Sequence, residues 1–362
     1  MMLDLDELLR YTVAHSGSDL HVKVGSPPHV RVDGYLLPAP FDPVTAADSE
    51  RMAFAVMPRD RADEFVAGSE ADFALGMPDL GRFRVNVFRQ RGAVGLVFRR
   101  VLPGIPSFEA LGLPPVVRRL AEEQRGMVLV TGPTGSGKTT TIAAMIDHIN
   151  ETKSVNVVTV EDPIEVLHTD KRALVNQREI GTDTKDYATA MRRVLRQDPD
   201  VIFIGEMRDP ETVWAALAAA ETGHLVLSTL HTTNAVETVN RIVDFFPPFQ
   251  QKQVRLSLAS SLRGVVSQRL LERSDHKGRV PSVEVLVNTG RIFDRIVDPD
   301  QGDNDSIEEI IADGEYYGMQ TFDQSLFNLF KNGQVDLRSA MASASNPHDF
   351  RISLQQAGLI PA

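Results

Sequence analysis

The feature that most constrains how this chain can fold is the run at 132–139, which reads Gly-Pro-Thr-Gly-Ser-Gly-Lys-Thr. A short apolar stretch at 127–130, typical of a buried strand, comes before it, and an apolar stretch with helical spacing at 142–146 comes after it. This order of strand, glycine-rich loop and helix is that of a P-loop, in which consecutive backbone N–H groups form a concave nest for phosphate oxygens. The N-terminus of the helix adds partial positive charge. The chain is therefore predicted to bind a nucleoside triphosphate.

The residue types within this loop indicate separate roles. Gly135 and Gly137 can adopt positive φ at little cost and keep side chains out of the nest. Lys138 is predicted to reach the β and γ phosphates, and the Thr139 hydroxyl to ligate Mg²⁺. The cofactors expected are therefore ATP and Mg²⁺. The predicted nucleotide-binding residues are Gly132, Pro133, Thr134, Gly135, Ser136, Gly137, Lys138, Thr139 and Thr140.

Composition restricts the class of protein. The formal net charge is −11, which argues against general nucleic-acid binding, because neutralising phosphates needs clustered Lys and Arg. The absence of cysteine excludes disulfides and thiolate metal sites and fits a reducing compartment. The N-terminus lacks the features of a signal peptide, and no stretch approaches the ~20 apolar residues of a membrane span. We expect a soluble cytoplasmic protein that meets a membrane only through partners.

The pattern of the chain predicts an α/β protein in two parts. Residues 1–100 mix an amphipathic helix at 4–15, strands at 20–24, 29–32, 70–75, 82–90 and 93–100, and helical sequence at 45–67, which is typical of a small α+β domain. The segment 101–106 contains two prolines and a glycine and is predicted to be a stiffened linker.

The second part has a different periodicity. Within 107–288, near-continuous apolar runs at 126–131, 155–160, 201–205 and 225–230 alternate with helical stretches at 138–150, 185–196 and 210–222. Apolar strands between helices predict a parallel sheet covered on both faces. Residues 289–362 are predicted to be a mostly helical C-terminal region without a clear strand.

Two of the apolar strands end in acidic residues. The run at 201–205 is followed by Glu206, which resembles a Walker B strand, although Gly-Glu replaces the more familiar Asp-Glu. Because ligands of open α/β sheets bind at the carboxyl ends of the strands, Glu206 is predicted to face the Mg²⁺. The strand at 157–160 is followed by Glu161, Asp162 and Glu165, which are all candidates for positioning the attacking water. Spacing alone does not rank these three.

The strand at 225–230 has a histidine near each end. His231 lies at the edge where the phosphates are expected, and its imidazole can sense the γ phosphate by hydrogen bonding. His224 lies at the opposite end, where geometry alone favours a structural role.

Residues 81–100 hold six arginines and no acidic residue. Period-two alternation places Arg82 and Arg84 on one face of a strand and Phe83 and Val85 on the other. A solvated face, an arginine finger that stabilises charge on the transferred phosphoryl group, and a nucleic-acid contact are the three interpretations. The six arginines are Arg82, Arg84, Arg89, Arg91, Arg99 and Arg100.

Taken together, the motifs are similar to those of the secretion-ATPase superfamily, and most similar to those of the type IV pilus retraction ATPases (PilT-like), along nearly the whole chain. The resemblance rests on the P-loop and on four further stretches that occur in the family's order. These are Val-Glu-Asp-Pro-Ile-Glu at 160–165, Ile-Gly-Glu-Met-Arg-Asp at 204–209, Thr-Gly-His through His-Thr-Thr-Asn at 222–234, and Gly-Met-Gln-Thr-Phe-Asp-Gln-Ser-Leu at 318–326.

The resemblance implies roles for individual residues. Glu165 would polarise the attacking water and Glu206 would support Mg²⁺. Both His224 and His231 would belong to the shell of the active site, contrary to the structural role that geometry alone favours for His224. Arg84 and Arg99 match arginines that the N-terminal domain brings to the phosphates. The catalytic residues implied are Glu165, Glu206, Arg84, Arg99, His231 and His224, with Thr139 and Glu206 on the metal.

The resemblance also implies an architecture and partners. The fold would be a PAS-like N-terminal domain followed by a RecA-like ATPase domain, assembled as a homo-hexameric ring. The ring would power type IV pilus retraction and twitching motility, working on the inner-membrane platform protein of the pilus machinery from the cytoplasmic face of the inner membrane. The absence of an extra N-terminal domain and of a tetracysteine zinc module favours retraction over assembly or secretion.

One departure concerns the family's retraction-linked helix, typically Ala-Ile-Arg-Asn-Leu-Ile-Arg-Glu. The aligned stretch at 291–298 reads Arg-Ile-Phe-Asp-Arg-Ile-Val-Asp and keeps only the amphipathic spacing. An accessory function therefore stands beside retraction. Three further functions stay open: a pilus-extension or type II secretion ATPase, a nucleic-acid translocase, and a nucleotide sensor that does not hydrolyse.

Overall fold

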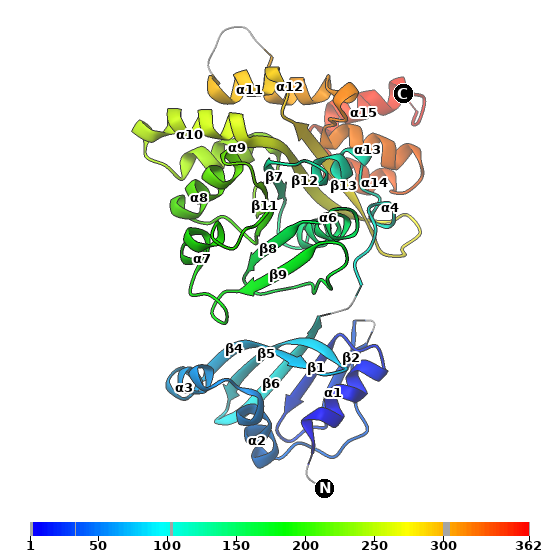
Figure 1. The fold of residues 1–362 in the computed structure, drawn as a ribbon. Coiled ribbons are helices and arrows are strands. Elements are labelled where there is room, and N and C mark those ends of the chain that lie inside the picture. Colours follow the sequence, from blue (N-terminus) through cyan, green and yellow to red (C-terminus); the bar gives the residue numbers. More distant parts are fainter. Residues whose placement is uncertain (1–2, 33, 102–103, 300–304, 362) are drawn as a thin grey trace. The chain divides into compact units, whose positions relative to one another are not determined.

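The computed structural model describes residues 3–32, 34–101, 104–299 and 305–361 (Figure 1). The chain divides into two compact units, the first comprising residues 1–104 and 165–167 and the second residues 105–164 and 168–362. Each unit has its own sheet and its own hydrophobic core. Residues 102 and 103 of the predicted linker lie outside the described residues.

The first unit is built on a six-stranded antiparallel sheet with the strand order β3-β2-β1-β6-β5-β4. The helical stretch predicted at 45–67 is divided in two, because Met57 is extended and precedes Pro58, and a residue before proline disfavours the helical region. The edge strand β3 is an addition to the prediction. The elements are α1 (Leu5–Ala14), β1 (Asp19–Lys23), β2 (His29–Val32), β3 (Tyr35–Pro38), α2 (Ala46–Val56), α3 (Arg59–Gly68), β4 (Glu70–Met77), β5 (Gly81–Gln90) and β6 (Ala93–Val101).

The second unit contains a seven-stranded sheet with the order β13-β12-β7-β11-β10-β8-β9. All four predicted strands are present and parallel, but β12 and β13 form an antiparallel pair at one edge. The sequence pattern misses these two strands because buried polar residues (Ser267, Gln268 and Glu284) interrupt their apolar runs. The strands are β7 (Gly126–Thr131), β8 (Asn156–Glu161), β9 (Leu174–Glu179), β10 (Val201–Ile204), β11 (Leu225–Leu230), β12 (Leu262–Glu272) and β13 (Arg279–Val287).

Helices cover both faces of this sheet, as predicted. Alternate residues of β7 belong to different cores: Met127 and Leu129 pack into one, and Val128 and Val130 pack into the other. Period-two alternation therefore divides the apolar surface of a single strand between two helical layers. The covering helices are α4 (Phe108–Leu111), α5 (Pro115–Ala121) and α6 (Lys138–Thr152) on one face, and α7 (Tyr187–Val194), α8 (Pro210–Glu221), α9 (Ala235–Asp244) and α10 (Pro248–Ser261) on the other.

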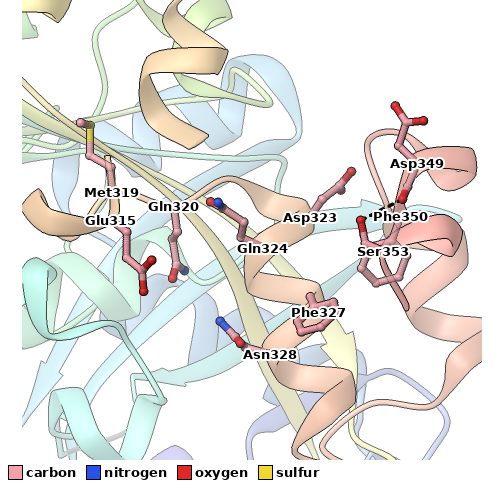
Figure 2. A pocket seen from close by; sticks show the side chains of 10 residues that line it. All are labelled: Glu315, Met319, Gln320, Asp323, Gln324, Phe327, Asn328, Asp349, Phe350 and Ser353. Atoms are coloured by element: carbon pink, nitrogen blue, oxygen red, sulfur yellow. Dashed lines mark hydrogen bonds between the residues drawn. The ribbon is translucent and has the colours of Figure 1, made fainter. Parts of the chain in front are cut away.

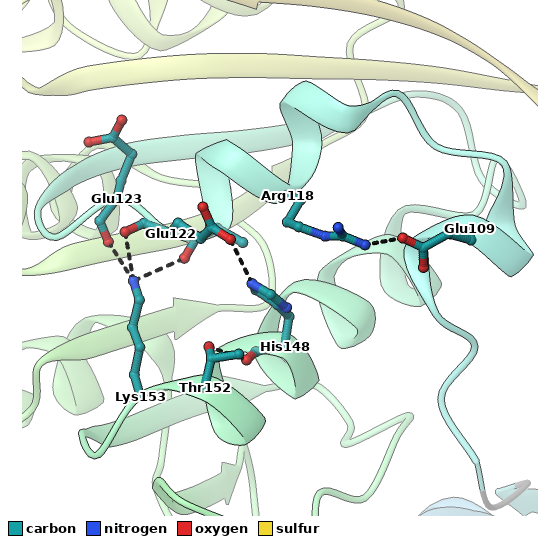
Figure 3. A network of polar contacts seen from close by, with 8 residues as sticks. Glu109, Arg118, Glu122, Glu123, His148, Thr152 and Lys153 are labelled. Carbon is teal, nitrogen blue, oxygen red and sulfur yellow. Dashed lines mark hydrogen bonds and ion pairs between the residues drawn. The ribbon is translucent and has the colours of Figure 1, made fainter.

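A polar network fastens α5 to the C-terminal end of α6 (Figure 3). The ammonium group of Lys153 donates to the backbone carbonyls of Ala121, Glu122 and Glu123 at the end of α5. Cations at a helix C-terminus satisfy unpaired carbonyls and interact favourably with the helix dipole. One turn earlier on α6, His148 Nε2 lies 3.1 Å from Glu122 Oε1. The helix that begins in the P-loop is thus held at its far end.

The C-terminal region is helical, as predicted. In α11, Ile292 and Ile296 are fully buried, so the divergent stretch at 291–298 keeps an apolar face. Among the described residues, every helix is too short or too polar to cross a lipid bilayer. The elements are α11 (Gly290–Val297), α12 (Ile307–Ala312), the short 3-10 helix η1 (Glu315–Tyr317), α13 (Phe322–Lys331), α14 (Leu337–Ser343) and α15 (Pro347–Gln356).

Candidate nucleotide-binding and hydrolysis site

The loop at 132–137 joins β7 to α6 with three glycines in the left-handed region, Gly132, Gly135 and Gly137. A Cβ atom on Gly132 would lie 2.4 Å from the Gln268 carbonyl oxygen, so no larger residue fits there. The φ of Gly135 is +80°, which L side chains rarely adopt. The backbone therefore takes the open, side-chain-free course that a phosphate nest requires.

Two side chains equip this nest for an anion. The ammonium group of Lys138 donates to the carbonyls of Gly132 at 2.7 Å and Pro133 at 3.1 Å, which curls the loop around it. The Ser136 hydroxyl is buried and, among the described residues, has no hydrogen-bond partner. A buried hydroxyl without a partner is costly unless a ligand satisfies it, and a phosphate oxygen would do so. The residues present therefore fit a bound triphosphate.

Three predicted residues, Lys138, Glu206 and His231, meet beyond the carboxyl ends of β7, β10 and β11. His231 lies between the other two. Its Nδ1 is 3.5 Å from Lys138 Nζ, and its Nε2 is 3.3 Å from Glu206 Oε1. The other Glu206 oxygen pairs with Arg208 at 2.6 Å, which raises the pKa of that guanidinium through the hydrogen bond. These contacts suit an imidazole whose Nδ1 accepts a hydrogen bond from Lys138 and whose Nε2–H donates one to Glu206. His231 thus links the P-loop lysine to the acid after β10.

The close packing around Gly205 explains why Gly-Glu, and not Asp-Glu, follows β10. A Cβ atom at this position would lie 2.8 Å from the Tyr187 hydroxyl and 3.3 Å from the Val160 carbonyl oxygen. The backbone N–H of Gly205 donates to that same carbonyl, which joins the end of β10 to β8. An aspartate in place of Gly205 would collide with α7, so one acidic residue remains for the metal. If Mg²⁺ binds here, Thr139 and Glu206 would supply two oxygen ligands, and such a sparse set fits Mg²⁺, which retains several waters.

The three acids after β8 have different environments. Glu161 is buried, and its Oε1 accepts from the Thr159 hydroxyl at 2.6 Å and from Gln177 at 3.1 Å. Asp162 and Glu165 are exposed. Between them, the Asp162–Pro163 peptide bond is cis. Because Glu161 is buried and its Oε1 already accepts two hydrogen bonds, the geometry favours Asp162 and Glu165 over Glu161 for positioning a water.

Sequence reasoning missed Glu179, the last residue of β9. It is buried, and its Oε2 accepts from the Ile164 backbone N–H at 2.9 Å, immediately before Glu165. This bond fixes the course of the loop that carries Glu165. The only signal available was an acid at the end of a strand that was itself not predicted.

The remaining predicted residues lie elsewhere. His224 stands at the N-terminal end of β11, opposite His231, and its Nδ1 lies 2.9 Å from the Ala219 carbonyl oxygen. In the first unit, Arg84 and Arg99 face each other across β5 and β6, and Arg99 donates to Asp19 at 2.8 Å. Glu165 also groups with the first unit, whereas Lys138, Glu206 and His231 belong to the second. The roles of His224, Arg84, Arg99 and Glu165 stay predictions, as do those of the other predicted site residues.

The motif at 318–326 is anchored to the sheet and lines a cavity. Gln320 forms a β-bridge with Val285 of β13, and Thr321 caps α13 together with Gln324. Figure 2 shows the cavity, which has a volume of about 410 Å³ and a mixture of acidic and apolar walls. Its lining residues are Glu315, Met319, Gln320, Asp323, Gln324, Phe327, Asn328, Asp349, Phe350 and Ser353.

Comparison with known proteins gives consistent matches. Residues 105–309 match the family model described as "Type II/IV secretion system protein". The type IV pilus retractation ATPase PilT of Pseudomonas aeruginosa is 41% identical over 96% of this chain and 100% of its own length. The type IV pilus ATPase PilU of the same organism is 38% identical over 98% of this chain and 92% of its own. A crystal structure of the pilus retraction motor PilT with bound ADP has a TM-score of 0.87 and 44% identity, covering 96% of this chain and 98% of that one.

Proposed function

Since this chain belongs to the type II/IV secretion system protein family, within the secretion-ATPase superfamily that its motifs indicate, we propose that it hydrolyses ATP to power the retraction of type IV pili. The observation that carries the proposal is the cluster of Lys138, His231 and Glu206 at the mouth of a P-loop. The near full-length similarity to PilT supports the retraction assignment.

In the proposed reaction, the backbone nest and Lys138 hold the β and γ phosphates, and the Ser136 hydroxyl bonds to a phosphate oxygen. Thr139 and Glu206 would hold Mg²⁺, which when bound would neutralise charge on the transferred phosphoryl group. Glu165 orients the attacking water. His231 contacts both Lys138 and Glu206, so its position can report whether the γ phosphate is present.

The motor proposal extends to the assembly. Residues 1–100 would act as the PAS-like domain and residues 107–288 as the RecA-like core, joined at 101–106 and followed by the helical region at 289–362. In a homo-hexameric ring, hinge closure would bring Arg84 and Arg99 to the phosphates, and His224 would complete the active-site shell. The ring would act on the platform protein of the pilus machinery, peripheral to the cytoplasmic side of the inner membrane.

A second candidate function is that of an accessory pilus ATPase. It is favoured by the divergent sequence of α11. Deleting the gene separates the candidates: excess surface pili without twitching indicate retraction, normal retraction with a loss of force indicates an accessory role, and bald cells indicate extension.

The site itself is tested by the Lys138→Ala variant. We expect ATP turnover to fall by at least about 10³-fold, because the loop loses the cation that stabilises charge on the phosphoryl group. Steady-state phosphate release measures the effect, and circular dichroism checks that the variant is folded. Turnover at the wild-type rate would refute the site.

A further inference from the structure

Glu284 of β13 is a buried acid that no part of the proposed mechanism uses. Only 7% of its surface is exposed, and its Oε1 accepts from the backbone N–H of Ala235 at 2.8 Å. Burial raises the pKa of this carboxyl to about 7. Ala235 is the first residue of α9, so the carboxylate lies against a helix N-terminus, where negative charge is stabilised.

A row of polar side chains extends from Glu284 across the sheet. Glu284 pairs in register with Ser267 of β12, and Ser267 pairs with Thr131 of β7. Residues paired in this way point to the same face of a sheet. The hydroxyls of Ser267 and Thr131 lie 2.8 Å apart, and Thr131 directly precedes the P-loop.

The first turn of α9 rests on this row. The Thr238 hydroxyl lies 3.5 Å from that of Thr131 and 2.7 Å from that of Thr232. Thr232 follows His231 directly, and α9 begins three residues later. The polar row thus ties the end of the P-loop strand to the segment that carries His231.

From this arrangement we propose that Glu284 is a positioning residue for hydrolysis. By binding the N-terminus of α9, it holds the His231 segment at the distance from Lys138 and Glu206 that turnover requires. The inference rests on the proposed role of His231 in ATP turnover. Glu284 touches neither nucleotide nor metal in this scheme, so it acts through His231.

The test compares two substitutions. Glu284→Met fills the same space but offers no oxygen acceptor to Ala235, whereas Glu284→Gln keeps one. We expect Glu284→Met to lower kcat at least about tenfold with the KM for ATP nearly unchanged, because displacement of a catalytic group affects the reaction more than binding to an intact P-loop. Glu284→Gln should retain most of the wild-type kcat. A Met variant with wild-type kcat, or a Gln variant as impaired as Met, would overturn the proposal.

A double-mutant cycle tests whether the effect passes through His231. Once His231→Ala has been introduced, Glu284→Met should reduce kcat no further, because residues that act as a unit are not additive. Additive losses would mean that Glu284 acts elsewhere. If His231→Ala alone leaves kcat unchanged, the proposed role of His231 fails, and this outcome differs from failure of the Glu284 inference.

Controls separate positioning from simple loss of stability. Asp48 is a similarly buried acid that bonds to the Thr45 backbone N–H in the first unit, so Asp48→Leu should lower the melting temperature without changing kcat per folded molecule. If Glu284→Met does not fold, Thr238→Ala removes the other contact between α9 and the polar row, namely the hydroxyl that lies near those of Thr131 and Thr232, and should lower kcat at unchanged KM. Unchanged turnover in a folded Thr238→Ala protein would then overturn the proposal.

Discussion

The carboxyl ends of β8 and β10 are similar in sequence and different in structure. Both strands are buried and largely apolar, and they lie side by side in the sheet. β8 ends in Glu161, and β10 is followed by Gly205 and Glu206. After β10, Gly205 turns the chain and Glu206 meets Arg208 and His231. After β8, Glu161 turns inward to Thr159 and Gln177. An acid at a strand end is therefore only a candidate until its neighbours are known.

The strongest test of this comparison between the two strand ends is Glu165→Gln, a substitution in the loop that follows β8. We expect ATP still to bind and turnover to fall by about 10²–10⁴-fold, the usual contribution of a positioned acid or base. Nucleotide-binding and phosphate-release assays measure the two effects separately.

The buried neighbour is the matched control for this variant. Glu161→Gln should keep turnover within about threefold and lower stability by about 1 kcal/mol, because an amide replaces a hydrogen-bonded carboxylate. If Glu161→Gln abolished turnover and Glu165→Gln did not, the assignment of the two acids would be reversed.

The end of β10 is tested with Gly205→Ala. The added Cβ would lie 2.8 Å from the Tyr187 hydroxyl, so we expect a loss of about 1–3 kcal/mol in stability and a shift of Glu206. Urea unfolding and ATP turnover measure the two consequences. Adding Tyr187→Phe to the Gly205→Ala variant removes the colliding oxygen, and it should restore part of the lost stability and part of the lost ATP turnover. If Gly205→Ala loses as much stability and turnover with Phe at position 187 as with Tyr, contact with the Tyr187 hydroxyl is not the reason why position 205 is glycine.

The smallest effect is expected from Arg208→Ala. Its pair with Glu206 is largely exposed on the arginine side, and exposed ion pairs contribute about 0–1 kcal/mol. Stability should be nearly unchanged and turnover should fall no more than about threefold, since His231 still contacts Glu206. A loss as large as that of Glu165→Gln would make Arg208 part of the catalytic set.

Much of the fold and part of the site could be predicted from local pattern. The P-loop, the strands β7, β8, β10 and β11, and the ends that carry Glu206 and His231 depend on apolar runs and glycine spacing, which neighbouring residues encode directly. The antiparallel pair β12–β13 escaped prediction because Ser267, Gln268 and Glu284 are polar residues buried by contacts distant in sequence. Glu179 escaped for the same reason.

By itself, the sequence determined that a triphosphate would rest on a glycine loop between a strand and a helix, because backbone conformation at such a loop depends on local residue type. Only the tertiary structure decided which acids face that loop, that Tyr187 demands Gly205, and that Glu284 lies beneath α9. These contacts join residues far apart in the chain. Their geometry follows from the order and packing of the strands, and the pattern of neighbouring residues does not contain that information.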